Sequence, residues 1–403
     1  MTFSDLNLIQ PLIEALKITG YENPTPIQQK AIPHLLVGRD VFGCAQTGTG
    51  KTAAFALPIL QMLSANKSTT QTNGIKALIL APTRELAIQI GESFDAYGKL
   101  LSIRHSVIFG GVSQLNQTKA LGRGVEVVIA TPGRLLDLMQ QGFVKLHHIN
   151  FFVLDEVDRM LDMGFINDIR KIITKIPAKR QTIFFSATVP PDIQKLADTL
   201  LNNPVSVQVA PVSEPATAVK QLMYYVDKGD KKQLLLDVLK QGHINHALIF
   251  TRTKHGADKV VKDLVKSGIS AEAIHGNKSQ NARQRALNGF KDRTIQMLVA
   301  TDIASRGIDV DKLTHVINYE LPEVPETYIH RIGRTGRAGE SGSAISFCSP
   351  EEIDYLKDIN KLLKRSVEMA PTHPLPANVM AMKSPPKKKG FSNRRGPREF
   401  KKR

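Results

Sequence analysis

Short apolar runs alternate along the chain with longer stretches in which apolar residues recur every three or four positions. The short runs predict buried strands, and the longer stretches predict amphipathic helices. The strands expected in the first part of the chain are residues 41–44, 77–81, 106–109, 125–130, 151–154 and 182–185. Those expected in the second part are 222–226, 247–250, 271–274, 297–300, 315–319 and 343–347. This alternation is typical of an α/β fold with doubly wound parallel sheets.

Chain length and breaks in the pattern predict two domains. A chain of 403 residues is too long for one ordinary core. Residues 204–218 carry three prolines among small residues, which predicts a linker centred near 210–216. We expect a first domain over 1–208 with a preface at 1–38, a linker over 209–218 and a second domain over 219–370. Residues 371–403 lose all periodicity, which predicts a disordered basic tail.

The charge is strongly uneven. The net charge is +17, and residues 383–403 hold ten Lys or Arg and one Glu. Such an excess predicts a polyanionic partner, nucleic acid before membrane, because no amphipathic apolar face accompanies it. The alternative is a solvated tail that only aids solubility. The chain shows no signal-peptide pattern and no apolar run of about 18 residues, and its two cysteines are expected to be buried thiols, so we expect a cytoplasmic protein.

A Gly-rich stretch joins the expected strand 41–44 to a helical pattern that starts near Lys51. Its residues are Ala45, Gln46, Thr47, Gly48, Thr49, Gly50, Lys51 and Thr52. A strand, a Gly-rich turn and a helix form a cradle for phosphate, because free backbone N–H groups meet at the start of the helix. We expect Lys51 to reach the β- and γ-phosphates and the Thr52 hydroxyl to hold Mg²⁺. The alternative is a strand-to-helix turn without a ligand, and Ala45 departs from the Gly that begins the general pattern.

An acidic run follows the expected strand 151–154. We assign Asp155 to Mg²⁺, largely through water, and Glu156 to positioning or activating the attacking water. Ser186 and Thr188 follow the strand 182–185, where their hydroxyls are expected to bond Asp158 and to report the state of the nucleotide. The alternative is a plain acidic turn.

The preface carries a second nucleotide signal. Residues 6–19 predict a helix that Gly20 ends. Two prolines then stiffen the chain before Gln28, whose carboxamide offers the donor and acceptor that the edge of adenine needs. Tyr21 is placed to stack on the base. The alternative is that Gln28 caps the next helix.

Arginines cluster in the second domain. Arg331, Arg334 and Arg337 recur every third residue, which predicts several guanidinium groups directed at one anion. If they meet the phosphate cradle of the first domain, ATP lies in the cleft and its hydrolysis requires the domains to close. The alternative is a basic surface loop.

With these motifs in order over about residues 3–350, the chain resembles the DEAD-box ATP-dependent RNA helicases, and within them the bacterial RhlE-like branch. The resemblance implies two tandem RecA-like domains and a phosphate loop that starts with Ala. It places Arg334 and Arg337 as arginine fingers, and Gly307 and Asp309 at the nucleotide. The chain departs at Val157, where the family has Ala, so we expect altered coupling between ATP hydrolysis and unwinding.

The resemblance also implies RNA contacts, mostly to the backbone and therefore with little sequence specificity. They match Pro82, Thr83, Arg84, Gly110, Gly111, Thr131, Pro132, Gly133, Arg134, Thr251, Arg252, His275, Gly276, Gln280, Arg283, Thr301, Asp302 and Arg306. The implied activity is RNA-stimulated ATP hydrolysis that unwinds short RNA duplexes and remodels RNA–protein complexes, with ribosome assembly and RNA decay as family-level settings. Two alternatives stay open: an ATP-gated RNA clamp or scaffold with little unwinding, and a DNA helicase.

Overall fold

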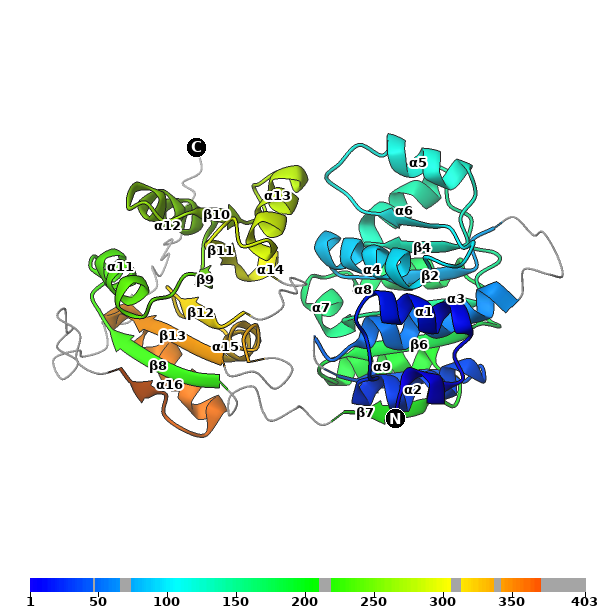
Figure 1. The fold of residues 1–403 in the computed structure, drawn as a ribbon, viewed down its shortest axis with the longest axis horizontal. Helices are drawn as coiled ribbons and strands as arrows, with labels where there is room; N and C mark the ends of the chain where they lie inside the picture. Colours follow the sequence, from blue (N-terminus) through cyan, green and yellow to red (C-terminus); the bar gives the residue numbers. More distant parts are fainter. Residues whose placement is uncertain (46–47, 66–73, 210–218, 306–312, 337–341, 371–403) are drawn as a thin grey trace, which may run out of the picture.

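The computed structural model describes residues 1–403 apart from 46–47, 66–73, 210–218, 306–312, 337–341 and 371–403. The described residues form two seven-stranded sheets flanked by helices, which lie side by side in Figure 1. We call the parts around the first and second sheets the first and second domain. The predicted α/β class with parallel sheets is confirmed. The expected linker and tail fall almost entirely outside the described residues.

The first sheet has the strand order β3-β4-β2-β5-β6-β1-β7. Its strands are β1 (Val41–Cys44), β2 (Ala77–Leu80), β3 (His105–Ile108), β4 (Val127–Ala130), β5 (Phe151–Leu154), β6 (Gln181–Ser186) and β7 (Val205–Gln208). Its helices are η1 (Phe3–Leu6), α1 (Gln10–Ile18), α2 (Pro26–Leu36), α3 (Lys51–Ala65), α4 (Arg84–Tyr97), α5 (Leu115–Gly122), α6 (Pro132–Gln140), α7 (Val157–Asp162), α8 (Ile166–Ile173) and α9 (Pro191–Leu200). The central strands β2, β4 and β5 are apolar at every position because helices cover both faces.

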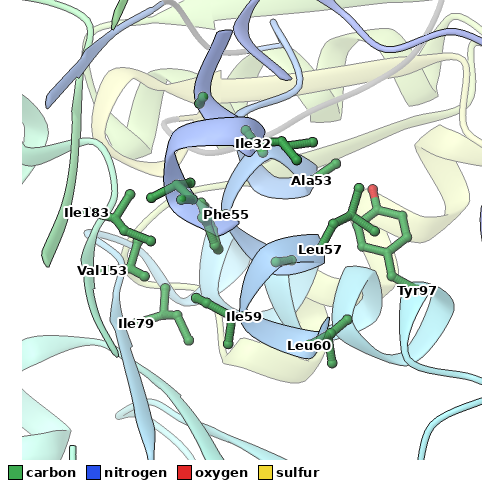
Figure 2. Close-up of a cluster of buried hydrophobic side chains, with 14 of the residues drawn as sticks. Ile32, Ala53, Phe55, Leu57, Ile59, Leu60, Ile79, Tyr97, Val153 and Ile183 are labelled. Atoms are coloured by element: carbon green, nitrogen blue, oxygen red, sulfur yellow. The ribbon is translucent and has the colours of Figure 1, made fainter. Parts of the chain in front are cut away.

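Helix α3 is buried along most of its length, and this fixes the Gly-rich loop in front of it. Figure 2 shows its apolar side chains packed on the sheet and on neighbouring helices. The packed residues are Phe55, Leu57, Ile59 and Leu60 of α3, with Ile79, Val153 and Ile183 of the sheet, Ile32 of α2 and Tyr97 of α4. Because α3 begins at Lys51, the core positions the first turn of the helix.

One local expectation for the first domain is wrong, and one strand was missed. The helix expected over 6–19 is split into η1 and α1, because Asn7 adopts a left-handed conformation with φ 57°. Gly20 ends α1 with φ +79°, as expected. The proline-containing stretch from 204 includes a strand that was not expected: β7 pairs in parallel with β1 at the edge of the sheet and ends at Gln208, within the expected first domain. An edge strand buries one face only, so a four-residue run beside a proline gave a weak signal.

The second sheet has the order β10-β11-β9-β12-β13-β8-β14. Its strands are β8 (Val219–Tyr225), β9 (Ala247–Thr251), β10 (Ala271–Ile274), β11 (Met297–Thr301), β12 (His315–Asn318), β13 (Gly342–Cys348) and β14 (Glu368–Met369). Its helices are α11 (Lys231–Gln241), α12 (Lys254–Lys266), α13 (Gln280–Lys291), α14 (Asp302–Ser305), α15 (Pro325–Ile332), η3 (Pro350–Glu352) and α16 (Ile353–Leu363). The two-residue strand β14 was not expected, because so short a run has no period. Within the described ranges, no helix is long and apolar enough to cross a membrane.

Candidate nucleotide and RNA site

The Gly-rich loop lies between the buried strand β1 and the buried helix α3. Gly48 and Gly50 have φ values of +83° and +92°, a region that favours glycine. A Cβ on Gly50 would overlap the side chains of Gln28 and Thr25, so the loop can pass close to α2 only with glycine there. Gln46 and Thr47, both predicted to bind phosphate, lie outside the described residues.

Lys51 and Asp155 lie side by side in the buried part of the site. The Lys51 Nζ donates a hydrogen bond to the Ala45 carbonyl (2.9 Å) and lies 4.0 Å from Asp155 Oδ1. Burial raises the pKa of Asp155 to about 6, although the Lys51 ammonium acts in the opposite direction. Asp155 Oδ1 is buried and has no hydrogen-bond partner within the described ranges. A buried carboxylate oxygen that accepts no hydrogen bond fits a hydrated Mg²⁺.

Glu156 begins helix α7 with a left-handed backbone, φ 53° and ψ 53°. Such a conformation is costly for a residue with a Cβ, and it recurs at active sites. Its Oε2 accepts a hydrogen bond from Arg159 Nη1 at 2.6 Å, and both side chains are buried. Val157 is fully buried in the core below, where its β-branched side chain anchors the start of α7.

The predicted hydrogen bonds between Asp158 and the strand β6 are confirmed. Asp158 Oδ2 accepts from the backbone N–H of Ala187 (3.2 Å) and from the N–H and hydroxyl of Thr188 (3.0 and 3.1 Å). The Ser186 hydroxyl accepts from the Asp158 N–H at 3.3 Å. The role of these three residues in coupling hydrolysis to unwinding stays a prediction.

Gln28 caps helix α2, which was the alternative prediction for this residue. Its predicted contact with the edge of adenine stays a prediction. Its Oε1 accepts from the Thr25 N–H (2.9 Å), which caps α2, and its Nε2 donates to the Gly50 carbonyl (3.0 Å). Tyr21 is half exposed and stands edge-on to Tyr97, with ring centroids 6.0 Å apart. A cavity of about 660 Å³ brings these predicted residues together, lined among others by Tyr21, Gln28, Gly48, Gly50, Lys51, Thr52, Asp155 and Glu156.

Most RNA residues predicted in the first domain lie where helices begin, whereas Gly110 and Gly111 lie in the bend before α5. The Thr83 hydroxyl accepts from the Leu86 N–H (3.2 Å) and caps α4, and Thr131 precedes α6 with Pro132 in its first turn. Helix starts present free N–H groups and partial positive charge, which suits phosphates. Gly111 has φ +78° and lies against the Arg84 guanidinium, so a side chain there would displace that arginine.

Two helix caps of the second domain were missed. Thr253 caps α12 by accepting from the Gly256 N–H (3.0 Å), and Ser279 caps α13 by accepting from the Ala282 N–H (3.3 Å). A Thr or Ser just before an apolar helical pattern was the signal that could have found them. They place two further helix starts beside the predicted residues Thr251 and Gln280.

Arg252, a predicted RNA residue, has its partners within the second domain, and its contact with RNA stays a prediction. Its guanidinium lies 3.7 to 3.9 Å from the carboxylates of Glu320, Glu323 and Glu352, and it stacks over Tyr355. Three carboxylates offset its charge within the domain, so the side chain is poorly placed to attract a phosphate. His275 Nε2 is bonded to Asp258 at 3.1 Å.

The expectation that Arg331, Arg334 and Arg337 point at one anion is wrong for Arg331. Arg331 is buried, makes two bonds to Asp302 (2.6 and 2.8 Å), and stacks over Phe250. A planar guanidinium pairs best with a carboxylate in this two-bond geometry, so the pair fastens α15 to the end of β11. Arg334 is also buried. Arg306, Gly307, Asp309 and Arg337 lie outside the described residues.

Two predicted RNA residues of the second domain bind the first domain. Gln280 Nε2 donates to Glu85 Oε1 (3.0 Å), and Arg283 Nη2 lies 3.0 Å from the same oxygen. Arg84 Nη1 donates to Gln280 Oε1 at 3.4 Å. These three residues therefore lie where the two domains meet, and their contact with RNA stays a prediction.

The class of protein follows from comparison with known families. The DEAD/DEAH box helicase family matches residues 25–196, and the helicase conserved C-terminal domain matches residues 230–339. The chain is 43% identical to the ATP-dependent RNA helicase CshA of Limosilactobacillus reuteri, over 93% of this chain and 74% of the relative. It is also 43% identical to the RNA helicase CrhR of a Synechocystis strain, over 91% of this chain and 74% of the relative.

Comparison with solved structures indicates the same family. The Dbp5 protein of S. cerevisiae bound to RNA and ADP BeF3 superposes with a TM-score of 0.80 at 31% identity, covering 92% of this chain and 95% of Dbp5. The chain therefore belongs to the DEAD-box family of ATP-dependent RNA helicases, built from two tandem RecA-like domains. The family, the expected enzyme class, and the use of ATP and RNA are confirmed with it.

Proposed function

We propose that this chain closes its two domains on ATP and on one strand of an RNA duplex, and that closure locally unwinds the duplex or displaces a bound protein. One observation carries the proposal. The phosphate loop, Gln28, Asp155 and Glu156 line one cavity that Lys291 of the second domain also lines, and Glu85 of the first domain is bonded to Gln280 and Arg283 of the second. The domain that holds the nucleotide site is thus bonded directly to the second domain.

Within the cavity, each side chain has a separate task. Lys51 binds the β- and γ-phosphates, and Glu156 holds the attacking water. On closure, Arg334 and Arg337 of the second domain would offset charge on the transferred group. Mg²⁺, held by Thr52 and by Asp155 through water, would neutralise charge on the phosphates. Gly307 and Asp309 complete the nucleotide contacts, and Tyr21 covers the base.

RNA is proposed to lie along the helix starts, with Thr83, Thr131, Gly111 and Thr251 near its phosphates. Contacts of backbone N–H groups with phosphates carry little sequence information, so binding is largely independent of sequence. The basic tail adds affinity through its charge.

ATP turnover with and without RNA tests this function. We expect RNA to stimulate hydrolysis, and Lys51→Ala, Glu156→Gln and Arg337→Ala each to lower the stimulated rate about 100-fold or more. Lys171→Ala, which removes an exposed lysine of α8, is the matched control and should keep the wild-type rate. Full activity of Glu156→Gln would remove Glu156 from its assigned role.

A duplex-release assay separates unwinding from clamping. Release of a short labelled strand on ATP addition supports the helicase. An intact duplex, with RNA retained in the presence of a non-hydrolysable nucleotide, would instead establish an ATP-gated clamp. Stimulation by DNA and not by RNA would contradict the choice of nucleic acid.

We further propose that the chain belongs to the RhlE-like branch, acts in the cytoplasm and joins ribosomal or RNA-degrading complexes. Both cysteines are free thiols, which supports a reducing compartment. Crosslinking in cells, followed by sequencing of the bound RNA, tests whether the chain acts in ribosomal or in RNA-degrading complexes. Recovery of neither ribosomal RNA nor decaying transcripts would contradict it.

A further inference from the structure

Arg159, which neither the phosphate loop nor the arginine cluster includes, holds the carboxylate of Glu156. Its Nη1 lies 2.6 Å from Glu156 Oε2, and the two side chains are 9% and 3% exposed. A charge-assisted hydrogen bond of this length, screened from water, constrains direction as well as distance. The orientation of Glu156 in this structure is therefore set by Arg159.

The short helix between the two residues is anchored in the core. Val157 and Met160 are fully buried on one side of α7, and Asp158 is bonded to the end of β6 on the other. Residues three apart on a helix share one face, so Arg159 cannot move away from Glu156 without a change of its own rotamer. The backbone of α7 is thus anchored in the first domain, and the contact between the two side chains depends on the rotamer of Arg159.

The same guanidinium faces the second domain. Arg159 lines a cavity of about 20 Å³ whose other lining residues are Phe250, Asp302, Thr327, His330, Arg331 and Arg334. One side of Arg159 therefore touches the carboxylate assigned to the attacking water, while the other meets α15 and the start of α14. Arg159 thus lines this cavity between the domains, and Glu156 does not.

We infer that Arg159 is a positioning residue that makes the orientation of Glu156 depend on the seating of the second domain. The inference rests on the proposed function, because it assigns Arg159 to the same hydrolytic site. Arg159 itself need not contact ATP. It holds the Glu156 carboxylate in one direction when α15 lies against it, and leaves that carboxylate less constrained when α15 is withdrawn.

Kinetics of Arg159 variants test the inference. In the full chain, Arg159→Ala should lower RNA-stimulated kcat about tenfold, because a misdirected base loses alignment with the water, while KM for ATP stays within about twofold. Arg159→Lys keeps one charged donor and should recover part of the loss. Arg170→Ala, an exposed arginine of α8, is the matched control and should match wild type. Thermal unfolding of each variant reports any loss of folding.

Adding Arg159→Ala to Glu156→Gln protein distinguishes a positioning role of Arg159 from a structural one. In single-turnover reactions of Glu156→Gln protein, adding Arg159→Ala should cause no further loss, because Arg159 acts through the Glu156 carboxylate. An equal loss in both backgrounds, a faster Arg159→Ala enzyme, or a change confined to KM would overturn the inference. Wild-type protein without RNA-stimulated hydrolysis would instead overturn the proposed function, whereas active wild type with fully active Arg159→Ala would overturn this inference alone.

Discussion

At the scale of single residues, one side chain serves both the preface and the phosphate loop. Gln28 uses its oxygen to cap α2 and its amide nitrogen to hold the Gly50 carbonyl. The capping alternative is therefore met, and the contact of Gln28 with adenine stays a prediction. The cap fixes the rotamer that directs the donor at the loop.

Gln28→Glu separates these two functions. The carboxylate still accepts from the Thr25 N–H, but it cannot donate to Gly50. Removing that bond should raise KM for ATP about tenfold, while the thermal midpoint stays near wild type. Gln29→Glu, whose amide is bonded to Pro24 and not to the loop, is the control. An unchanged KM in Gln28→Glu would show that the bond to Gly50 does not support nucleotide binding.

At the scale of elements, a buried ion pair joins four parts of the second domain. Lys231 of α11 pairs with Glu352 of η3 and also donates to the carbonyls of Tyr319 (2.9 Å) and Phe347 (3.4 Å), near the ends of β12 and β13. Glu352 accepts in addition from the N–H groups of Leu321 and Ser349. A buried charge needs such a complete set of partners, because desolvation is costly.

Lys231→Met should destabilise the second domain by about 3–5 kcal/mol, because it leaves the Glu352 carboxylate buried without its cation. Lys232→Met removes a half-exposed neighbour and should cost less than about 1 kcal/mol. Urea unfolding can be followed by tyrosine fluorescence, since the chain has no Trp and five of its seven tyrosines lie beyond residue 218. Equal midpoints for the two variants would contradict the importance of the pair.

At the scale of the whole molecule, the contact around Glu85 links the domains. Glu85 is buried at the start of α4 and meets Gln280 and Arg283 at the start of α13. Figure 1 shows α13 on the side of the second domain that faces the first. Both helix starts also carry predicted RNA residues, so the domain contact and the RNA surface share one region.

A double-mutant cycle measures this contact. Glu85→Gln and Arg283→Gln should each raise the RNA concentration that half-saturates ATPase stimulation, by about fivefold. The double variant should be little worse than either, since the coupled pair contributes about 1 kcal/mol once. Arg285→Gln, exposed on α13, is the control. Strictly additive effects would show that the two residues act on RNA separately.

The tail is tested by deleting residues 383–403. Removal of ten basic side chains should weaken RNA binding and flatten its dependence on salt, by about 0.7 in slope for each phosphate that the tail neutralises. Binding curves at several salt concentrations measure the slope. An unchanged slope would support the alternative that the tail is solvated and only aids solubility.

The sequence by itself determined the features that depend on neighbouring residues. Most strands were predicted within one or two residues, because apolar runs and helical periods are local signals. The phosphate loop and acidic run were equally evident, since their chemistry lies in consecutive residues such as Gly50 and Lys51 or Asp155 and Glu156.

Only the tertiary structure decided which partners those residues take. Arg331 and Arg334 look alike in sequence, yet Arg331 is bound to Asp302, 29 residues away. Arg252 is directed at three glutamates, and β7 gains its place by pairing with β1. Such contacts join segments brought together by strand order and domain packing, and a guanidinium binds whichever anion the fold puts nearest.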